Sequence, residues 1–160
     1  SVFGLAERLN VDRKEAKALI DGYFENYPNV KAYMDQSIQE AREKGYIETI
    51  FKRKRYLPDI NSKNAVVRGY AERNAINAPI QGSAADIIKV AMIRIYQRFQ
   101  EEGIRSKMIL QVHDELNFSV LPEEKEKVQQ IVISEMEAAY KMKAPLRADH
   151  GWGQNWLEAH

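Results

Sequence analysis

The sequence predicts an α+β fold, in which long helices precede a mostly antiparallel sheet that is itself covered by helices. Two observations lead to this prediction. Apolar residues recur at helical spacing through most of the first 45 positions, and strand-like runs follow around residues 46–57 and 108–120. This order, in which helices come first and strand pairs with covering helices come later, is typical of α+β proteins. We expect residues 1–62 to form one lobe and residues 63–160 the other.

The N-terminal part predicts two helices. Asp12 is a suitable N-cap with Glu15 three positions later, and the helix that follows should continue until Pro28 breaks it. Asn29 is expected to cap a second helix, which stops at Gly45. Both helices carry apolar stripes that we assign to packing: Leu19, Ile20, Tyr23, Phe24 and Tyr27 in the first, and Val30, Tyr33, Met34, Ile38 and Ala41 in the second.

A strand pair and two further helices are expected next. Residues 46–57 mix β-branched, aromatic and basic side chains, which predicts two strands whose charged tip, Lys52–Arg55, projects into solvent. A helix should then cover residues 65–77. Ala78–Pro79 predicts a break before another helix that reaches Phe99. The buried stripe of that helix is expected to be Ala84, Ile87, Ile88, Ala91, Ile95 and Phe99.

The C-terminal part predicts a hairpin, a covering helix and a closing strand. Strand-like runs at 108–110 and 116–120 place a turn at His113–Asp114. Pro122 suits the first position of a helix, with acidic residues in its first turn. Beyond Pro145, residues Leu146 to Trp152 are expected to form a strand, and Trp156 a final anchor.

Composition limits the classes of protein that need consideration. With 160 residues, 44% of them hydrophobic, the chain can bury one sizeable core. It has no cysteine, which excludes disulfides and thiolate metal sites and fits a reducing compartment. No apolar run approaches the roughly 20 residues that span a bilayer, and the N-terminus lacks the order of a signal peptide. We therefore expect a cytoplasmic protein without a membrane partner.

The hairpin tip is the strongest candidate for chemistry. Gln111-Val112-His113-Asp114-Glu115 places two acids and an imidazole at a turn, whereas tight turns alone favour Asn-Gly or Asp-Gly. A metal or catalytic role and an exposed polar turn are both compatible with this string of residues.

A second candidate surface involves three polar residues spaced by four. Arg73, Asn77 and Gln81 would share one helix face if the helix tolerated Pro79. Amide side chains can contact base edges and Arg can contact phosphates, but a solvated helix face would look the same. The basic run Lys52–Arg55 likewise suits either phosphate contacts or solvent. Since the net charge is only +1, nucleic-acid affinity must depend on how charge is distributed.

Several stretches, in this order, resemble the bacterial family-A DNA polymerases of the DNA polymerase I type. The resemblance is to the C-terminal third of those polymerases, and it covers essentially the whole chain. It rests on Ser1–Ala6, Arg55–Ile60, Ala71–Asp86, Gln111–Glu115 and the ending Asn155–His160.

The resemblance implies a role for each residue of the hairpin tip. Residues 1–62 would belong to the fingers subdomain, and residues 63–160 would be the palm with its motif C hairpin. Asp114 would hold two Mg²⁺ ions together with an aspartate from an earlier motif, for nucleotidyl transfer to a primer 3′-hydroxyl. Glu115 resembles the auxiliary acid, and His113 would lie against the primer terminus.

The implied partners are primer-template DNA and deoxynucleoside triphosphates. Gln81 and Asn77 resemble the minor-groove and backbone contacts that sense a correctly paired primer end. Arg73, with Ser1 and Phe3, resembles the group that handles the template strand. Arg68 is a further candidate for a phosphate contact.

The resemblance also indicates what these residues lack. Motif A, an aspartate-bearing strand, and motif B, a nucleotide-binding helix, have no counterpart in the sequence. We therefore expect a fragment that needs the missing N-terminal part of the same polymerase and does not polymerise DNA by itself. Lys52 stands where the family usually has glycine, and Lys54 where arginine is common.

Two other functions remain open. His113-Asp114 could be the metal dyad of an HD-type phosphohydrolase, although such a dyad belongs on a helix and the remaining histidines, His150 and His160, lie far downstream. The chain could also be a non-catalytic nucleic-acid-binding module. Motifs A and B encoded upstream would identify the polymerase, and for these residues alone the distinguishing result is salt-dependent DNA binding without primer extension.

Overall fold

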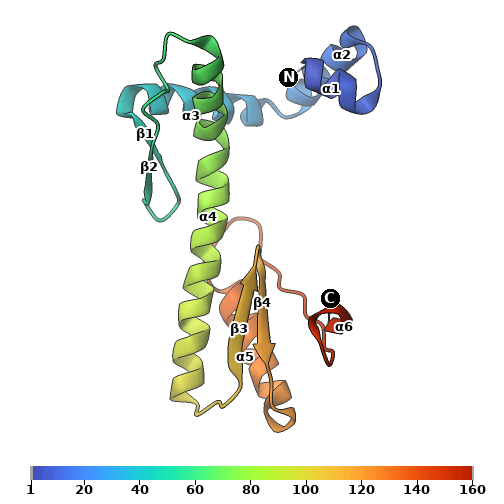
Figure 1. Ribbon diagram of the computed structural model, residues 1–160, viewed down its shortest axis with the longest axis vertical. Helices are drawn as coiled ribbons and strands as arrows, with labels where there is room; N and C mark the ends of the chain where they lie inside the picture. The colour runs from blue at the N-terminus through green and yellow to red at the C-terminus, as the bar shows by residue number, and fades with distance from the viewer. Residues whose placement is uncertain (1, 160) are drawn as a thin grey trace. The chain divides into compact units, whose positions relative to one another are not determined.

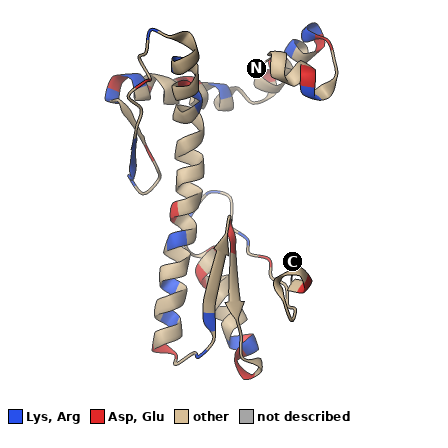
Figure 2. Cartoon of the chain, in the orientation of Figure 1, with Lys and Arg blue, Asp and Glu red and all other residues tan. Residues whose placement is uncertain are grey.

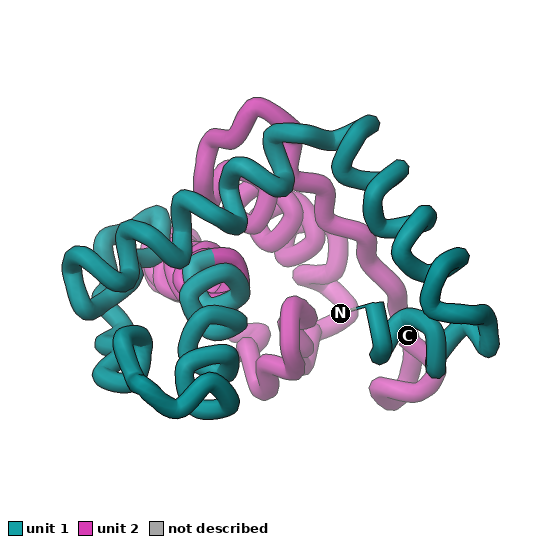
Figure 3. Tube along the Cα trace, turned by 90° about the horizontal axis from the view of Figure 1, so that it is seen from above, with its two compact units in different colours: residues 1–79 teal, residues 80–160 magenta. Residues whose placement is uncertain are grey.

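The structure, a computed structural model, describes residues 2–159. Its elements confirm the α+β prediction, with helices first and two small antiparallel sheets later (Figure 1). The chain divides into two compact units, unit 1 at Ser1–Pro79 and unit 2 at Ile80–His160 (Figure 3). The assignment of residues 1–62 and 63–160 to fingers and palm stays a prediction.

Unit 1 begins with three helices: α1 (Val2–Leu9), α2 (Arg13–Asn26) and α3 (Pro28–Lys44). The predicted N-cap is confirmed, because Asp12 Oδ1 accepts a hydrogen bond from the backbone N–H of Glu15 at 2.8 Å. The prediction for Asn29 is wrong, since α3 starts at Pro28 itself. Proline suits that first position because the N–H it lacks has no helical partner there. Gly45 ends α3 with φ of 77°.

The aromatic stripe of α2 is not the core that its spacing suggested. Tyr23 and Tyr27 are about half exposed, and their ring centroids lie 5.1 Å apart. The rings pack on each other, and the buried residue of α2 is Ala16. Helical spacing predicts a common face correctly, but it does not say whether another element covers that face.

The predicted strand pair is confirmed as β1 (Tyr46–Glu48) and β2 (Lys54–Tyr56), paired antiparallel with Ile47 opposite Arg55. Its tip turns through Lys52, whose φ is 64°. The hairpin packs on α3 and on the first turns of α4. The shared core of unit 1 is Ala41, Ile47, Leu57, Ile60, Ala71, Ala75 and Ala78.

The break predicted at Ala78–Pro79 is wrong. A single helix, α4 (Ala65–Glu101), contains Pro79 in its interior. Proline removes one backbone hydrogen bond and crowds the carbonyl four residues earlier, but such local preferences are overridden when packing supplies more. Here Ala71, Ala75 and Ala78 are buried in the core of unit 1. Close packing therefore holds the helical backbone up to the proline.

Unit 2 contains the rest of α4 and five further elements: β3 (Lys107–Val112), β4 (Glu115–Ser119), the 3₁₀ helix η1 (Pro122–Glu124), α5 (Lys125–Glu137) and α6 (Trp156–Ala159). The predicted turn at His113–Asp114 is confirmed. The helix expected from Pro122 does begin there, but its first turn is the 3₁₀ helix η1, as is frequent at helix N-termini, and α5 follows from Lys125. The core consists of Ala91, Ile95, Phe99, Val128, Ile131 and Ala139.

Two details of unit 2 correct the sequence analysis. Ala84 was expected in the buried stripe and is exposed. The strand expected at 146–152 does not form, and the segment attaches through a side chain, since Glu137 Oε1 accepts from Ala148 N at 3.2 Å. Its sequence alternates weakly, with only Leu146 and Ala148 half-buried. Among residues 2–159, no helix is long and apolar enough to cross a membrane.

Candidate active-site hairpin

The β3–β4 hairpin brings the predicted catalytic residues to a two-residue turn. Val112 pairs with Glu115, which leaves His113 and Asp114 as the turn itself. His113 has φ of 53°, the sign that two-residue hairpin turns require at their first position. Gln111 Nε2 donates to the carbonyl of His113 at 2.7 Å and braces the turn. Two-residue turns of this kind favour Asn, Asp or Gly at this position, so turn geometry alone does not select histidine.

The two faces of β4 differ, which determines where the acids point. Leu116 and Phe118 pack against the core of unit 2, and the Phe118 and Phe99 ring centroids lie 6.0 Å apart. Side chains alternate along a strand, so Glu115 and Asn117 lie on the opposite face. Asp114 is exposed at the tip, while Glu115 is half-buried.

The base of the hairpin is fastened by Glu124. Its carboxylate accepts hydrogen bonds from the backbone N–H of Arg105 at 3.0 Å, from the backbone N–H of Ser106 at 2.8 Å and from Ser106 Oγ at 2.6 Å. Ser106 Oγ in turn accepts from Leu121 N at 3.0 Å. These bonds, first those from Arg105, lower the pKa of Glu124 below its ordinary value of 4.5. The start of β3 and the segment after β4 are thereby joined.

The role of Glu124 and a second contact of the hairpin have no signal in the sequence. Glu124 looked like a first-turn acid that interacts with a helix dipole, and nothing in its spacing indicated Ser106 as a partner. Trp156 Nε1 donates to Glu115 Oε2 at 3.4 Å, a contact between residues 41 positions apart. Trp156 was expected only as an anchor.

The carboxylates of the tip suit magnesium in kind but not in number. Mg²⁺ is bound by carboxylate oxygens, substrate phosphates and water, so Asp114 and Glu115 are appropriate donors. Among residues 2–159, however, no three His, Cys, Asp or Glu side chains gather closely enough to hold a metal ion. A magnesium site at this tip would therefore need further carboxylates from outside the described residues.

The other predicted site residues lie mainly on α4. Arg73 and Asn77 are exposed in unit 1, and Gln81 is exposed in unit 2. The shared helix face expected of these three residues required a helix that tolerates Pro79, and α4 does continue through that proline. Arg73 has its guanidinium 5.9 Å from the centroid of the Tyr70 ring.

The structure gives contacts for two of the remaining predicted site residues, Arg68 and Phe3. Arg68 Nη1 donates to Ser62 O at 2.8 Å, so part of its guanidinium serves the fold. Phe3 is 55% exposed, with the Arg13 guanidinium 5.3 Å from its ring centroid. Ser1 lies outside the described residues.

Positive charge follows the β1–β2 hairpin of unit 1 (Figure 2). Lys52 to Arg55 are exposed, as predicted. Lys54 Nζ lies 4.3 Å from the centroid of the Tyr46 ring, and Tyr56 is 71% exposed. Basic and aromatic side chains together are suitable for contacts with nucleic acid.

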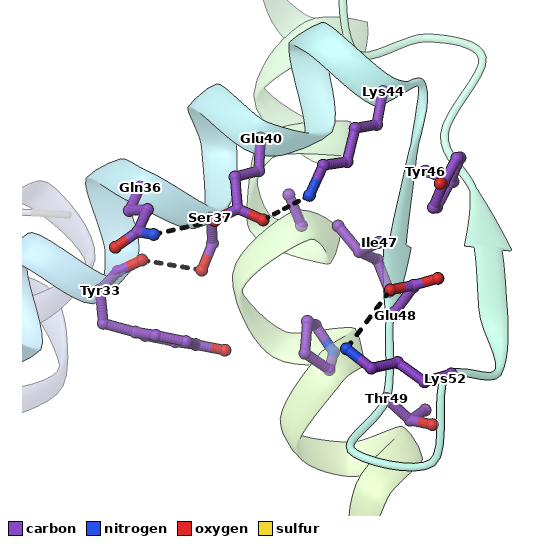
Figure 4. A pocket seen from close by; sticks show the side chains of 12 residues that line it. Tyr33, Gln36, Ser37, Glu40, Lys44, Tyr46, Ile47, Glu48, Thr49 and Lys52 are labelled. Atoms are coloured by element: carbon purple, nitrogen blue, oxygen red, sulfur yellow. Dashed lines mark hydrogen bonds and ion pairs between the residues drawn. The ribbon is translucent and has the colours of Figure 1, made fainter.

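A cavity of about 290 Å³ lies in unit 1 between α3, the β1–β2 hairpin and α4 (Figure 4). Its charged lining is paired internally: Lys44 Nζ lies 3.0 Å from Glu40 Oε2, and Lys52 Nζ lies 3.8 Å from Glu48 Oε2. None of the predicted site residues lines it, so the cavity does not contribute to the candidate site.

Comparison with known proteins places this geometry in a family. The family model for DNA polymerase family A matches residues 1–158. DNA polymerase I from Streptococcus pneumoniae serotype 4 is 53% identical over 159 residues, which cover 99% of this chain and 18% of the relative. DNA polymerase I from Bacillus caldotenax is 50% identical over 159 residues, with the same coverage. The chain therefore belongs to DNA polymerase family A.

A solved structure agrees. The POL domain of Pol1 from M. smegmatis, in complex with DNA primer-template and dNTP, superposes with a TM-score of 0.97 and 45% identity, covering 99% of this chain and 28% of that one. This chain thus spans about a fifth of the length of the curated relatives it matches. The HD-type alternative is excluded by the family and by the hairpin, because His113-Asp114 lies between two strands and not on a helix.

Proposed function

We propose that this chain supplies late fingers and palm elements of a template-directed DNA polymerase, which transfers nucleotides to a primer 3′-hydroxyl. The observation that carries the proposal is the β3–β4 hairpin of a family-A chain, with Asp114 exposed at its tip and Glu115 directly after it. Asp114 would be a catalytic metal ligand and Glu115 an auxiliary acid. Bound Mg²⁺ would supply activation of the hydroxyl and stabilisation of charge on the leaving group.

The DNA contacts follow from the exposed polar residues. His113 would lie against the primer terminus, and Asn77 and Gln81 would donate hydrogen bonds to the primer-template duplex. Minor-groove acceptors are similar for all Watson–Crick pairs, so such donors test pair geometry without selecting a sequence. Arg73 and Phe3, with Ser1, would contact the template strand, and Arg68 a phosphate. Primer-template DNA and deoxynucleoside triphosphates are the proposed partners.

The 160 residues alone would bind DNA without extending it. Two-metal catalysis requires carboxylates that converge from separate segments, and no group of three or more His, Cys, Asp or Glu among the described residues could hold a metal ion. The exposed basic side chains would still neutralise phosphates, which makes the binding weaken as salt rises.

The test compares this chain with the intact polymerase. Fluorescence anisotropy with a labelled primer-template between 50 and 200 mM salt should give a dissociation constant for the chain that rises steeply, by roughly a factor of ten or more if several phosphates are contacted. With Mg²⁺ and the four dNTPs, the chain should leave the primer unextended, whereas the intact polymerase should extend it. An intact protein that binds the primer-template but adds no nucleotide would refute the proposed function.

A further inference from the structure

The outer face of β4 carries Glu115, and this carboxylate is not left free. Trp156 Nε1 donates to Glu115 Oε2 at 3.4 Å, from a segment that follows β4 by almost forty residues. Glu115 immediately follows Asp114, the proposed metal ligand, so whatever fixes Glu115 acts next to the proposed reaction centre. Because Trp156 comes from a separate segment, it can fix Glu115 only if that segment is itself attached to unit 2.

The segment that carries Trp156 is attached to unit 2 at a second point. Trp152 Nε1 donates to Gln129 Oε1 on α5 at 3.2 Å. Lys125 Nζ, also on α5, lies 4.6 Å from the centroid of the Trp152 ring. We name residues 151–159 the C-terminal latch. Its Trp152 contacts α5, and its Trp156 contacts the β3–β4 hairpin.

The latch also makes hydrogen bonds within itself. The carboxylate of Glu158 accepts hydrogen bonds from Gln154 N at 2.9 Å and from Asn155 Nδ2 at 2.7 Å, while Glu158 N donates to Asn155 Oδ1 at 3.1 Å. This reciprocal pattern is that of a helix N-terminal cap. At Gly153, an added Cβ would lie 2.5 Å from Glu158 Cβ, so the fold of the latch admits only glycine there. Trp156 thus lies in a segment that is ordered by its own hydrogen bonds, which reduces the entropy lost when its contact to Glu115 forms.

We infer that Trp156 is a positioning residue for Glu115, and that the C-terminal latch sets the orientation of this auxiliary acid. The inference rests on the proposed function and adds a residue to it. A glutamate side chain has several rotatable bonds, so without a partner Glu115 samples orientations that include close approach to the Asp114 carboxylate. The indole N–H holds one Glu115 oxygen on the face of β4 opposite the core. Asp114 is thereby left as the carboxylate that reaches out from the tip.

The contact can be tested on the 160-residue chain by NMR, because its two tryptophans give two indole N–H signals. Glu115→Ala should shift the Trp156 indole signal and leave that of Trp152 in place. Gln129→Ala should do the reverse, which makes it the matched control. The inference is overturned if Glu115→Ala leaves the Trp156 signal unmoved, or moves both signals equally.

The functional role is tested by the same substitution at two positions in the intact polymerase. Trp156→Phe keeps an aromatic ring but removes the donor, and should lower kcat about threefold to tenfold while the KM for dNTP changes less than about twofold. Trp152→Phe removes the donor that attaches the latch to α5 but keeps the Trp156–Glu115 contact, and should lower kcat less than Trp156→Phe does. Equal losses in both variants, or none in Trp156→Phe, would overturn the positioning role. If the wild-type enzyme itself fails to extend a primer, the proposed function has failed, and the NMR result still decides the contact.

Discussion

The turn of the β1–β2 hairpin offers a sharp test of the backbone argument, through Lys52→Gly. Lys52 has φ of 64°, and its backbone N–H donates to Thr49 O at 2.9 Å, a bond that glycine keeps. For a residue with a Cβ, this left-handed conformation costs about 1–2 kcal/mol. Glycine removes that cost but makes the unfolded chain more flexible, by about 0.4–1 kcal/mol. The net expectation is a gain in the free energy of unfolding of roughly 0.5–1 kcal/mol.

Loss of the lysine side chain contributes little to this balance. The side chain is 80% exposed, and its ammonium lies 3.8 Å from Glu48 Oε2. Exposed ion pairs of this kind contribute between nothing and about 1 kcal/mol. Lys52→Ala is the matched control, because it removes the same side chain and ion pair but keeps the left-handed conformation and its cost.

Urea denaturation followed by circular dichroism provides the assay. The glycine variant should unfold at higher urea than the wild type with an unchanged slope, and the alanine variant should lie at or slightly below the wild type. In thermal unfolding, the gain corresponds to an increase in Tm of about 1–4 °C. A glycine variant no more stable than the alanine variant would show that the left-handed conformation at position 52 carries no such cost.

Two further predictions concern unit 2. Ile131→Ala deletes a fully buried side chain of α5 and should lower the free energy of unfolding by about 2–5 kcal/mol. Urea denaturation measures this loss, and a loss below about 1 kcal/mol would show that Ile131 is not part of a packed core. Glu124→Gln should destabilise the protein at pH 7, because an amide cannot accept all the bonds from Arg105 and Ser106. The pKa of Glu124 is lowered in the folded state, so its contribution is fully present above the ordinary value of 4.5 and is lost as pH falls through the folded value. Thermal unfolding from pH 7 to pH 3 should therefore show the two proteins converging in acid, and a difference that stays constant with pH would contradict this.

Elements whose local signals agree with packing were predictable from the sequence. The cap at Asp12, the stop at Gly45 and the turn at His113–Asp114 each combine a suitable side chain with a matching apolar pattern. The proposed catalytic tip belongs to this group, because the sequence placed its acids at the turn that the structure contains.

The errors arise where distant contacts decide the outcome. Pro79 indicated a break, but buried alanines on the preceding turns keep α4 helical up to that residue. Residues 146–152 suggested a strand, but the backbone N–H of Ala148 donates to the Glu137 side chain and not to a neighbouring strand. The bonds of Glu124 to Ser106 and of Trp156 to Glu115 join positions with no local relation, so no spacing rule could reveal them.

Whether Asp114 is a catalytic carboxylate can be measured by primer extension with the intact polymerase carrying Asp114→Asn, compared with Asp149→Asn. Both substitutions remove one negative charge from an exposed aspartate of unit 2. We expect Asp114→Asn to reduce the extension rate by about a hundredfold or more while primer-template affinity stays nearly unchanged, because a metal ligand is lost and the DNA contacts are kept. Asp149→Asn should extend as the wild type does. Normal extension by Asp114→Asn would show that this hairpin tip does not hold a catalytic carboxylate.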